Sequence, residues 1–211
     1  NFPQNSADGT MVQSASIAMN PKNGGITAVV GGRGKHVFRG FNRSTQMRRQ
    51  PGSTIKPIVV YTPALEHGYF YDSTLQDKKQ SYGTNNYTPK NYDDTYSGTV
   101  PMYKALYESL NAPAVWLLNK IGVNRGYDMA KKFGLPVEKG DKNLALALGG
   151  MTRGVSPQQM ARAYAVFAND GLMPSPHYIT KIEDASGKVI AKNDGSKNKR
   201  IISGKTAKEM T

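Results

Sequence analysis

The sequence predicts an α+β fold in which an antiparallel sheet is flanked by helices. The pattern gives two strands near the N-terminus, a block of helices in the middle and a second pair of strands near the C-terminus. Strands and helices that are segregated in this way favour an antiparallel sheet over a repeated strand–helix–strand unit. The 211 residues, of which 38% are hydrophobic, suffice for one sizeable core. No apolar run reaches the roughly 18–20 residues of a membrane span.

The first two strands form a predicted hairpin. Residues 12–20 roughly alternate between apolar and polar side chains, and residues 26–30 are an apolar run that ends at two glycines. The segment between them contains Pro21 and Gly24, which are typical of a turn. A loop over residues 33–51 is expected to follow the hairpin.

The first predicted helix carries Ser53 and runs to about Glu66, with Gly68 near its end. Residues 69–98 come next. They are rich in Tyr, Asn, Asp, Thr and Gly and show little periodicity, so they are predicted to form a long loop. Loops of that length inside a compact domain are usually functional.

The middle of the chain is a block of predicted helices. Ser156 and Pro157 open the clearest of them, because apolar residues from Met160 to Ala168 recur on one face until Gly171 stops the pattern. A second hairpin with its turn at residues 184–187 follows. In order, the expected elements are a helix capped by Thr99 that breaks at 109–111, helices over 114–121 and 124–133, a buried helix end or turn at 144–148, the helix from 156, and strands over 178–183 and 188–191.

Composition excludes several classes of site. The chain has no cysteine, so disulfides and thiolate metal sites are excluded. Its histidines, His36, His67 and His177, are far apart and lack ligand spacing, so we expect no metal and no cofactor. The net charge of +13 suits an anionic partner, such as nucleic acid, an acidic membrane surface or a wall polymer. The basic segments do not follow the pattern of a known nucleic-acid module, so no nucleic-acid partner is expected.

Ser53 and Lys56, within residues 50–57, are a candidate nucleophile and base. On a helix, their spacing of three places both side chains on one face. A serine hydroxyl needs a neighbouring base to become a good nucleophile, and a lysine can be that base only as the neutral amine. Because lysine titrates near ~10.4, this requires a pKa drop of roughly three units, which burial or a second cation can supply. Gly52 would let the backbone approach a substrate closely.

The same spacing has a plainer interpretation, because Ser53 could simply cap a helix. Ser196 and Lys199 also fit the Ser-x-x-Lys spacing, in a stretch that is predicted to be a solvated turn. The spacing alone therefore does not decide between a cap and a nucleophile. The glycine before Ser53, the apolar run after Lys56 and a second motif downstream favour the nucleophile.

The second motif is Ser109-Leu110-Asn111, on a predicted non-helical corner between two helices. A hydroxyl and an amide two residues apart on such a corner can point into one cleft. The serine could relay a proton, and the asparagine could hold a peptide group of a substrate. The alternative is a helix C-terminus with ordinary capping side chains.

Several stretches of the chain together form a recognisable pattern, namely residues 20–22, 41–43, 50–57, 87–93, 109–114 and 154–171. In this order they resemble the transpeptidase domain of class A (bifunctional) penicillin-binding proteins. The resemblance runs from about Gln13 to the end of the chain. It implies the serine β-lactamase/transpeptidase-like fold, with an antiparallel sheet flanked by helices.

The resemblance also implies an activity, which is cross-linking of peptidoglycan stem peptides by D,D-transpeptidation. Ser53 would attack the D-Ala–D-Ala bond, release the terminal D-alanine and pass the acyl group to an amine on a neighbouring stem. Lys56 matches the family's base, Ser109 its proton relay and Asn111 its substrate-holding amide. β-Lactam antibiotics would acylate the same serine. The implied location is the extracytoplasmic face of the cell membrane, with a membrane anchor in the full-length protein.

One departure from the family pattern concerns its third motif, Lys-Thr/Ser-Gly, which does not occur in this sequence. The near match at residues 205–207 is expected on a helix. We therefore expect residues 1–211 to form the N-terminal and central part of the domain. A further C-terminal segment of the same domain would be its partner and supply the third motif, and the family's glycosyltransferase domain would lie outside residues 1–211.

Two rival functions are a non-catalytic β-lactam sensor and a β-lactamase. The class A stretches at residues 42–43 and 87–93 favour a transpeptidase over a sensor. Leu110 replaces the aspartate of the β-lactamase Ser-Asp-Asn motif, and no Glu-x-x-Leu-Asn stretch is present, which argues against a β-lactamase.

Overall fold

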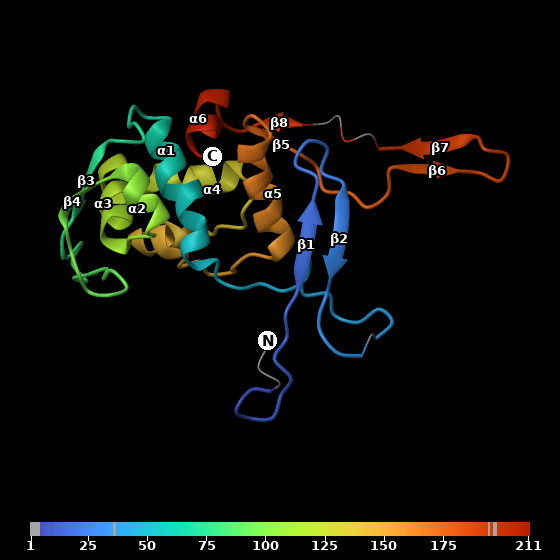
Figure 1. Ribbon diagram of the computed structural model, residues 1–211, viewed down its shortest axis with the longest axis horizontal. Helices are drawn as coiled ribbons and strands as arrows, with labels where there is room; N and C mark the ends of the chain where they lie inside the picture. Colours follow the sequence, from blue (N-terminus) through green and yellow to red (C-terminus); the bar gives the residue numbers. More distant parts are fainter. Residues whose placement is uncertain (1–4, 36, 194, 196–197) are drawn as a thin grey trace.

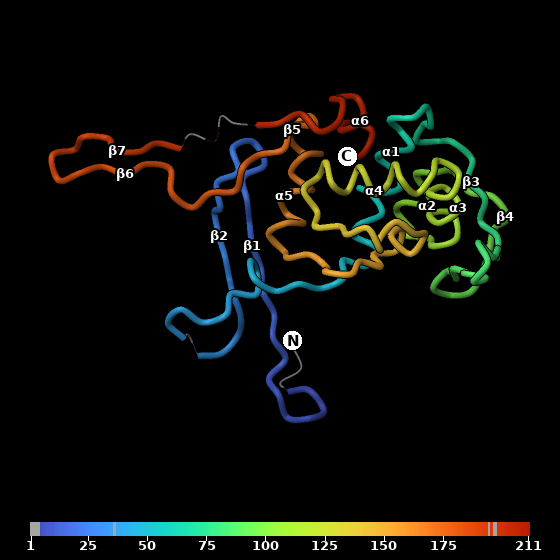
Figure 2. The backbone as a smooth tube through the Cα atoms, turned by 180° about the vertical axis from the view of Figure 1, so that it is seen from behind, coloured from blue at the N-terminus to red at the C-terminus, as the bar shows by residue number. Residues whose placement is uncertain are grey.

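A computed structural model describes residues 5–35, 37–193, 195 and 198–211. Its helices gather into one body, and the β1–β2 hairpin lies beside α5 at the edge of that body (Figure 1). The β6–β7 hairpin projects away from the body, as the view from behind also shows (Figure 2). The α+β composition predicted from the sequence is confirmed.

The N-terminal hairpin has the predicted form. Strand β1 (Ser16–Met19) pairs antiparallel with β2 (Ile26–Val30), and Ser16 lies opposite Val30. The loop that follows is anchored where Arg49 exchanges backbone hydrogen bonds with Val155, at 3.0 and 2.8 Å. This anchor places the start of the Ser53 helix beside the segment that precedes α5.

The helix predicted from Ser53 to Glu66 is present, but it changes type along its length. It begins as the 3-10 helix η1 (Gly52–Ile55), continues as the π-helix η2 (Pro57–Tyr61) and ends as α1 (Thr62–Leu65). Pro57 has no N–H to donate, so a regular helical ladder cannot pass through this position. The helix runs through the centre of the core, and Ile55, Ile58, Val59, Val60 and Tyr61 are all fully buried.

The prediction that residues 69–98 form one long loop is wrong near the start of this segment and at its end. Strand β3 (Thr74–Asp77) pairs antiparallel with β4 (Gly98–Pro101), and the buried Leu75 lies opposite the buried Val100. The helix expected to start at Thr99 consequently starts later, as α2 (Met102–Tyr107). Burial of this apolar pair in the core outweighs the weak strand pattern of the sequence.

The remaining helices largely follow the sequence pattern. The corner at residues 109–111 separates α2 from the next helix, as predicted. The clearest predicted helix, α5, starts with a capping box between Ser156 and Gln159. The helical segments are α3 (Asn111–Ile121), α4 (Val123–Lys132), the 3-10 helices η3 (Lys139–Asp141) and η4 (Leu144–Leu148), α5 (Pro157–Ala168) and α6 (Gly204–Glu209).

The C-terminal strands form two further antiparallel pairs. Strand β6 (Lys181–Glu183) pairs with β7 (Val189–Lys192), which confirms the second predicted hairpin. Strand β5 (Leu172–Met173) pairs with β8 (Lys199–Arg200). Within the described residues, the strands therefore form four two-stranded sheets and are not joined into one. The near match to the third motif lies on α6, as expected from the sequence. No helix in the described ranges has the length and apolar content to cross a membrane.

Gly126 on α4 allows this helix to pack directly on η2. A Cβ atom at this position would lie 2.5 Å from Val59 O and 2.6 Å from Leu118 Cδ1. Such distances are too short for any carbon, so one of the helices would have to move.

We predict that Gly126→Ala lowers the free energy of unfolding by about 1–3 kcal/mol, because overpacking outweighs the ~1 kcal/mol gain in helix propensity. Denaturant unfolding measures the change. Gly140→Ala is the matched control, since its Cβ would meet only Thr152 Oγ1, at 3.9 Å. Equal stability of the two variants would contradict the close packing of α4 on η2.

Candidate active site

Lys56 is a buried amine whose hydrogen-bond partners all belong to the corner between α2 and α3. Only 1% of its surface is exposed. Its Nζ lies 2.6 Å from Ser109 O, 3.2 Å from Ser109 Oγ and 2.7 Å from Asn111 Oδ1. Burial disfavours the charged form and lowers the pKa of Lys56 to about 8. A lysine with this pKa is neutral in about a tenth of the molecules at pH 7.

Ser53 lies one helical turn before Lys56, in η1, with its side chain exposed. The structure thus brings Lys56, Ser109 and Asn111 into direct contact. Within the described part of the chain, the backbone N–H of Lys56 donates to Ser53 O, but no side-chain hydrogen bond joins Ser53 to any of these three. The other Ser-x-x-Lys match begins at Ser196, which lies outside the described residues together with Lys197.

The turn that carries Ser53 is held from two sides. On one side, Gly149 ends η4 in the left-handed conformation, with φ of 88°, and a Cβ there would lie 2.6 Å from Gly52 O. On the other side, Tyr164 Oη donates a hydrogen bond to Thr54 O at 2.8 Å. The 3-10 partner of that carbonyl would be the N–H of Pro57, which does not exist. The tyrosine therefore satisfies a backbone acceptor that the proline leaves unpaired.

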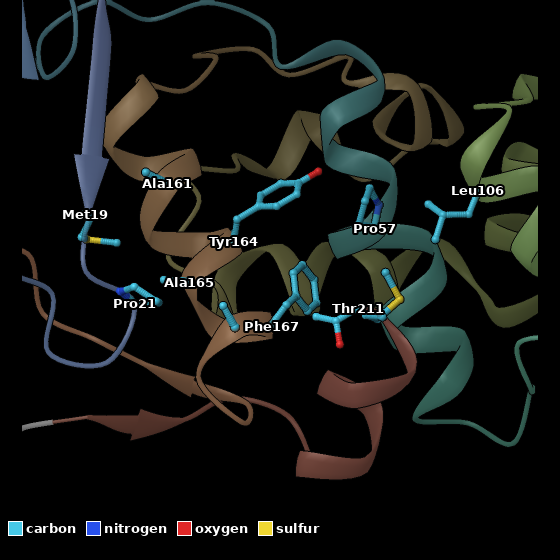
Figure 3. Close-up of a pocket in the computed structure, with 11 residues that line it drawn as sticks. Met19, Pro21, Pro57, Leu106, Ala161, Tyr164, Ala165, Phe167 and Thr211 are labelled. Carbon is cyan, nitrogen blue, oxygen red and sulfur yellow. The ribbon is translucent and has the colours of Figure 1, made fainter.

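Tyr164 also borders an apolar pocket of about 570 Å³ beside this turn. The tyrosine lies between α5 and the helix that carries Pro57, and its hydroxyl points toward that helix (Figure 3). Side chains from β1, η2, α2 and α5 and from the two residues after α6 line the pocket, including Met19, Leu106 and Met210. The four candidate site residues do not line it, so the pocket and the Lys56 cluster are distinct features.

The Ser109–Asn111 corner is a helix C-cap with an unusual residue in the left-handed position. Ser109 has φ of 56°, Ser109 N donates to Leu106 O, and Leu110 N donates to Ala105 O, each at 3.0 Å. This is the Schellman pattern, in which glycine is the usual residue. The capping interpretation is thus correct for the backbone. The cap also turns the carbonyl and hydroxyl of Ser109 toward Lys56.

Two buried polar side chains next to the corner had no role assigned from the sequence. Asn91 accepts hydrogen bonds from the backbone N–H groups of Asn111 and Ala112, and it donates to Asp77. Asn91 belongs to residues 87–93, one of the stretches that carry the family resemblance, so the resemblance could have identified it. Asp77 lies in the segment predicted as loop and had no such signal. No group of three or more His, Cys, Asp or Glu side chains in the described residues could hold a metal ion.

Comparison with known proteins places this geometry in a family. Residues 15–211 match the penicillin binding protein transpeptidase domain. The chain therefore belongs to the family of penicillin-binding protein transpeptidase domains, which confirms the resemblance found in its motifs.

Individual relatives agree with this assignment. Penicillin-binding protein 2a of Streptococcus pneumoniae is 48% identical over 100% of this chain, which spans 29% of that relative. The crystal structure of penicillin-binding protein 1A from Haemophilus influenzae shares 31% identity and a TM-score of 0.81, over 97% of this chain and 36% of that one. The PonA1 protein of Mycobacterium tuberculosis in complex with penicillin V shares 26% identity and a TM-score of 0.79, over 94% and 55%. These likenesses confirm the serine β-lactamase/transpeptidase-like fold class.

We predict that Ser109→Gly is more stable than Ser109→Ala by roughly 1 kcal/mol, because alanine keeps the strain of positive φ and glycine does not. Both variants lose the hydroxyl, so their difference isolates the backbone. Thermal and denaturant unfolding of the two variants measure it. If alanine proves as stable as glycine, Ser109 is not held in the left-handed conformation.

Proposed function

We propose that this chain carries the acyl-transfer site of a peptidoglycan D,D-transpeptidase, with Ser53 as nucleophile and Lys56 as base. The observation that carries the proposal is the burial of Lys56 against Ser109 and Asn111, one helical turn from an exposed serine. A depressed lysine pKa beside a serine is what nucleophilic catalysis needs. Membership of the transpeptidase family supports the reaction class.

In the neutral state, the Lys56 amine has two N–H donors and one lone pair. The donors suit the two nearer acceptors, Ser109 O and Asn111 Oδ1, and the lone pair can then accept the Ser109 hydroxyl or the proton of Ser53. Asn111 thereby helps to orient the lone pair. The side-chain amide of Asn111 is the proposed group that holds the peptide bond of the substrate.

The proposed reaction begins when Ser53 Oγ bonds to the carbonyl carbon of the D-Ala–D-Ala bond as its proton moves to Lys56 Nζ. The bond to the terminal D-alanine then breaks, and the leaving nitrogen takes a proton from Lys56 through the hydroxyl of Ser109. An amine of a neighbouring stem peptide then attacks the acyl carbon and loses a proton to Lys56. The bond between that carbon and Ser53 Oγ breaks, and Ser53 Oγ takes the proton back from Lys56. Backbone N–H groups at the start of η1 lack helical partners and can stabilise the oxyanion.

The partners and location follow from the same proposal. β-Lactams would acylate Ser53, as the penicillin V complex of the PonA1 structure makes reasonable for a relative with this fold. Peptidoglycan stem peptides would be the physiological substrates, at the extracytoplasmic face of a cell membrane. The Lys-Thr/Ser-Gly motif that is missing from residues 1–211 would come from a following segment of the same domain.

The proposal is tested by treating the complete polypeptide that contains residues 1–211 with penicillin and mapping the adduct by mass spectrometry. We expect one adduct, on Ser53, and none in Ser53→Ala. Lys56→Arg keeps the charge but cannot become neutral, so acylation should fall by at least ~10²-fold.

An adduct on Ser109 or Ser196 would contradict the assignment of the nucleophile. Near-normal acylation of Lys56→Arg would contradict the role of the base. Turnover of a stem-peptide substrate distinguishes the enzyme from a β-lactam sensor, and rapid hydrolysis of the penicillin adduct would identify a β-lactamase instead.

A further inference from the structure

We propose that Asp77 and Asn91 are a buried positioning pair that fixes the Ser109–Asn111 corner against Lys56. The inference rests on the proposed function, because it assigns these residues a role in the same acyl-transfer site. Among the described residues, neither is hydrogen-bonded to Ser53 or Lys56, so both would act through Asn111.

The corner needs help from outside because its own sequence cannot cap the next helix. Helix α3 starts at Asn111, and its N-cap residue, Leu110, has no side-chain acceptor for the first free N–H groups. Asn91 Oδ1 accepts both of them, from Asn111 N at 2.9 Å and from Ala112 N at 3.0 Å. The cap of α3 is thus supplied by a side chain 20 residues upstream.

The orientation of the Asn91 amide is fixed by its other end. Its Nδ2 donates to Asp77 Oδ1 at 2.7 Å and to Thr95 O at 2.9 Å. If the Asn91 amide were flipped, its oxygen would face two acceptors, Asp77 Oδ1 and Thr95 O, and its nitrogen would face two backbone N–H donors. All four hydrogen bonds would be lost. Asp77 is itself held by Ser97 N, which donates to Asp77 Oδ2 at 2.8 Å. Asp77 is 1% and Asn91 3% exposed, so water does not compete for these bonds.

The same segment also aims the side chain of Asn111. Asn111 Nδ2 donates to Lys90 O at 2.7 Å, which leaves Asn111 Oδ1 directed at Lys56 Nζ, also at 2.7 Å. Residues 90–91 thus hold both the backbone and the side chain of Asn111. A displacement of Asn91 would move the acceptors that orient the lysine amine, and shifts of about 1 Å at such groups can cost ~10²-fold in rate.

The uncharged amide of Asn91 lies between the carboxylate of Asp77 and the Ser109–Asn111 corner. If Asp77 contacted Lys56 directly, its charge would favour the ammonium form and oppose the burial that lowers the pKa of the lysine. Asn91 is held by Asp77 and in turn holds the backbone of Asn111 and Ala112, and its own amide is uncharged. The carboxylate orders the corner while the groups that face Lys56 stay uncharged.

The test compares Asn91→Asp, Asp77→Asn and the swapped double variant in the complete polypeptide, by penicillin acylation and melting temperature. In Asn91→Asp, two carboxylates face each other where the native bond is 2.7 Å long, and we expect acylation to fall at least ~10²-fold. Asp77→Asn should lower the acylation rate constant about 10-fold. The double variant restores one donor and one acceptor between the two positions, but its carboxylate at position 91 faces Thr95 O and lies next to the corner, so it should recover only part of the acylation rate that Asn91→Asp loses.

Asp141→Asn is the matched control, because Asp141 is a buried carboxylate that accepts hydrogen bonds from Glu138 N and Thr152 N, away from the corner. It should lower the melting temperature and leave the acylation rate constant unchanged. If Asn91→Asp does not fold, the comparison of Asp77→Asn with Asp141→Asn decides. Equal acylation by these two variants, or no recovery in a folded double variant, would overturn the inference. Failure of the wild type to acylate Ser53 would instead overturn the proposed function.

Discussion

The site depends on one buried amine that has no acidic partner. Lys56 takes part in none of the ion pairs between described residues, and its three acceptors are a carbonyl, a hydroxyl and an amide. An ammonium group in this position loses its hydration and gains no opposite charge in return, so the neutral amine is favoured. The surrounding structure maintains this preference for the neutral amine. The core helix buries the lysine, and the corner supplies acceptors without supplying charge.

The fold keeps the two ends of the Ser53–Lys56 turn in different surroundings. Lys56 points into the core beside fully buried side chains such as Ile55 and Ile58, while Ser53 stays at the surface. Pro57, directly after Lys56, disrupts the regular helix and leaves unpaired the carbonyl of Thr54, which Tyr164 satisfies. The irregular helix is therefore stabilised by contacts from η4 and α5. This explains how an irregular turn can persist beside a candidate nucleophile.

Much of the site could be predicted from the sequence because its signals are local. The spacing of Ser53 and Lys56 and the break at Ser109-Leu110-Asn111 both specify backbone geometry over a few residues. The contacts between these motifs could not be predicted from the residues alone, since they depend on tertiary packing. Among the described residues, the lysine amine bonds to the corner, and no side-chain hydrogen bond joins it to Ser53.

The fold shows the same division between local and long-range information. The sequence predicted the start of α5 at Ser156 and Pro157, its apolar face, and both hairpins with their turn residues. Strand β3 was missed because it is four residues long and pairs with a strand some twenty residues away across an irregular segment. Because β3 was not predicted, its last residue, Asp77, was not identified as a candidate either.

The most direct test of the central claim is a pH titration of the Lys56 side chain by NMR, with ¹³C-labelled lysine and Lys56→Arg to assign the signal. The account predicts a midpoint near the pKa of about 8 that burial produces. A midpoint near the ~10.4 of free lysine would show that the buried amine stays charged, and would contradict the account.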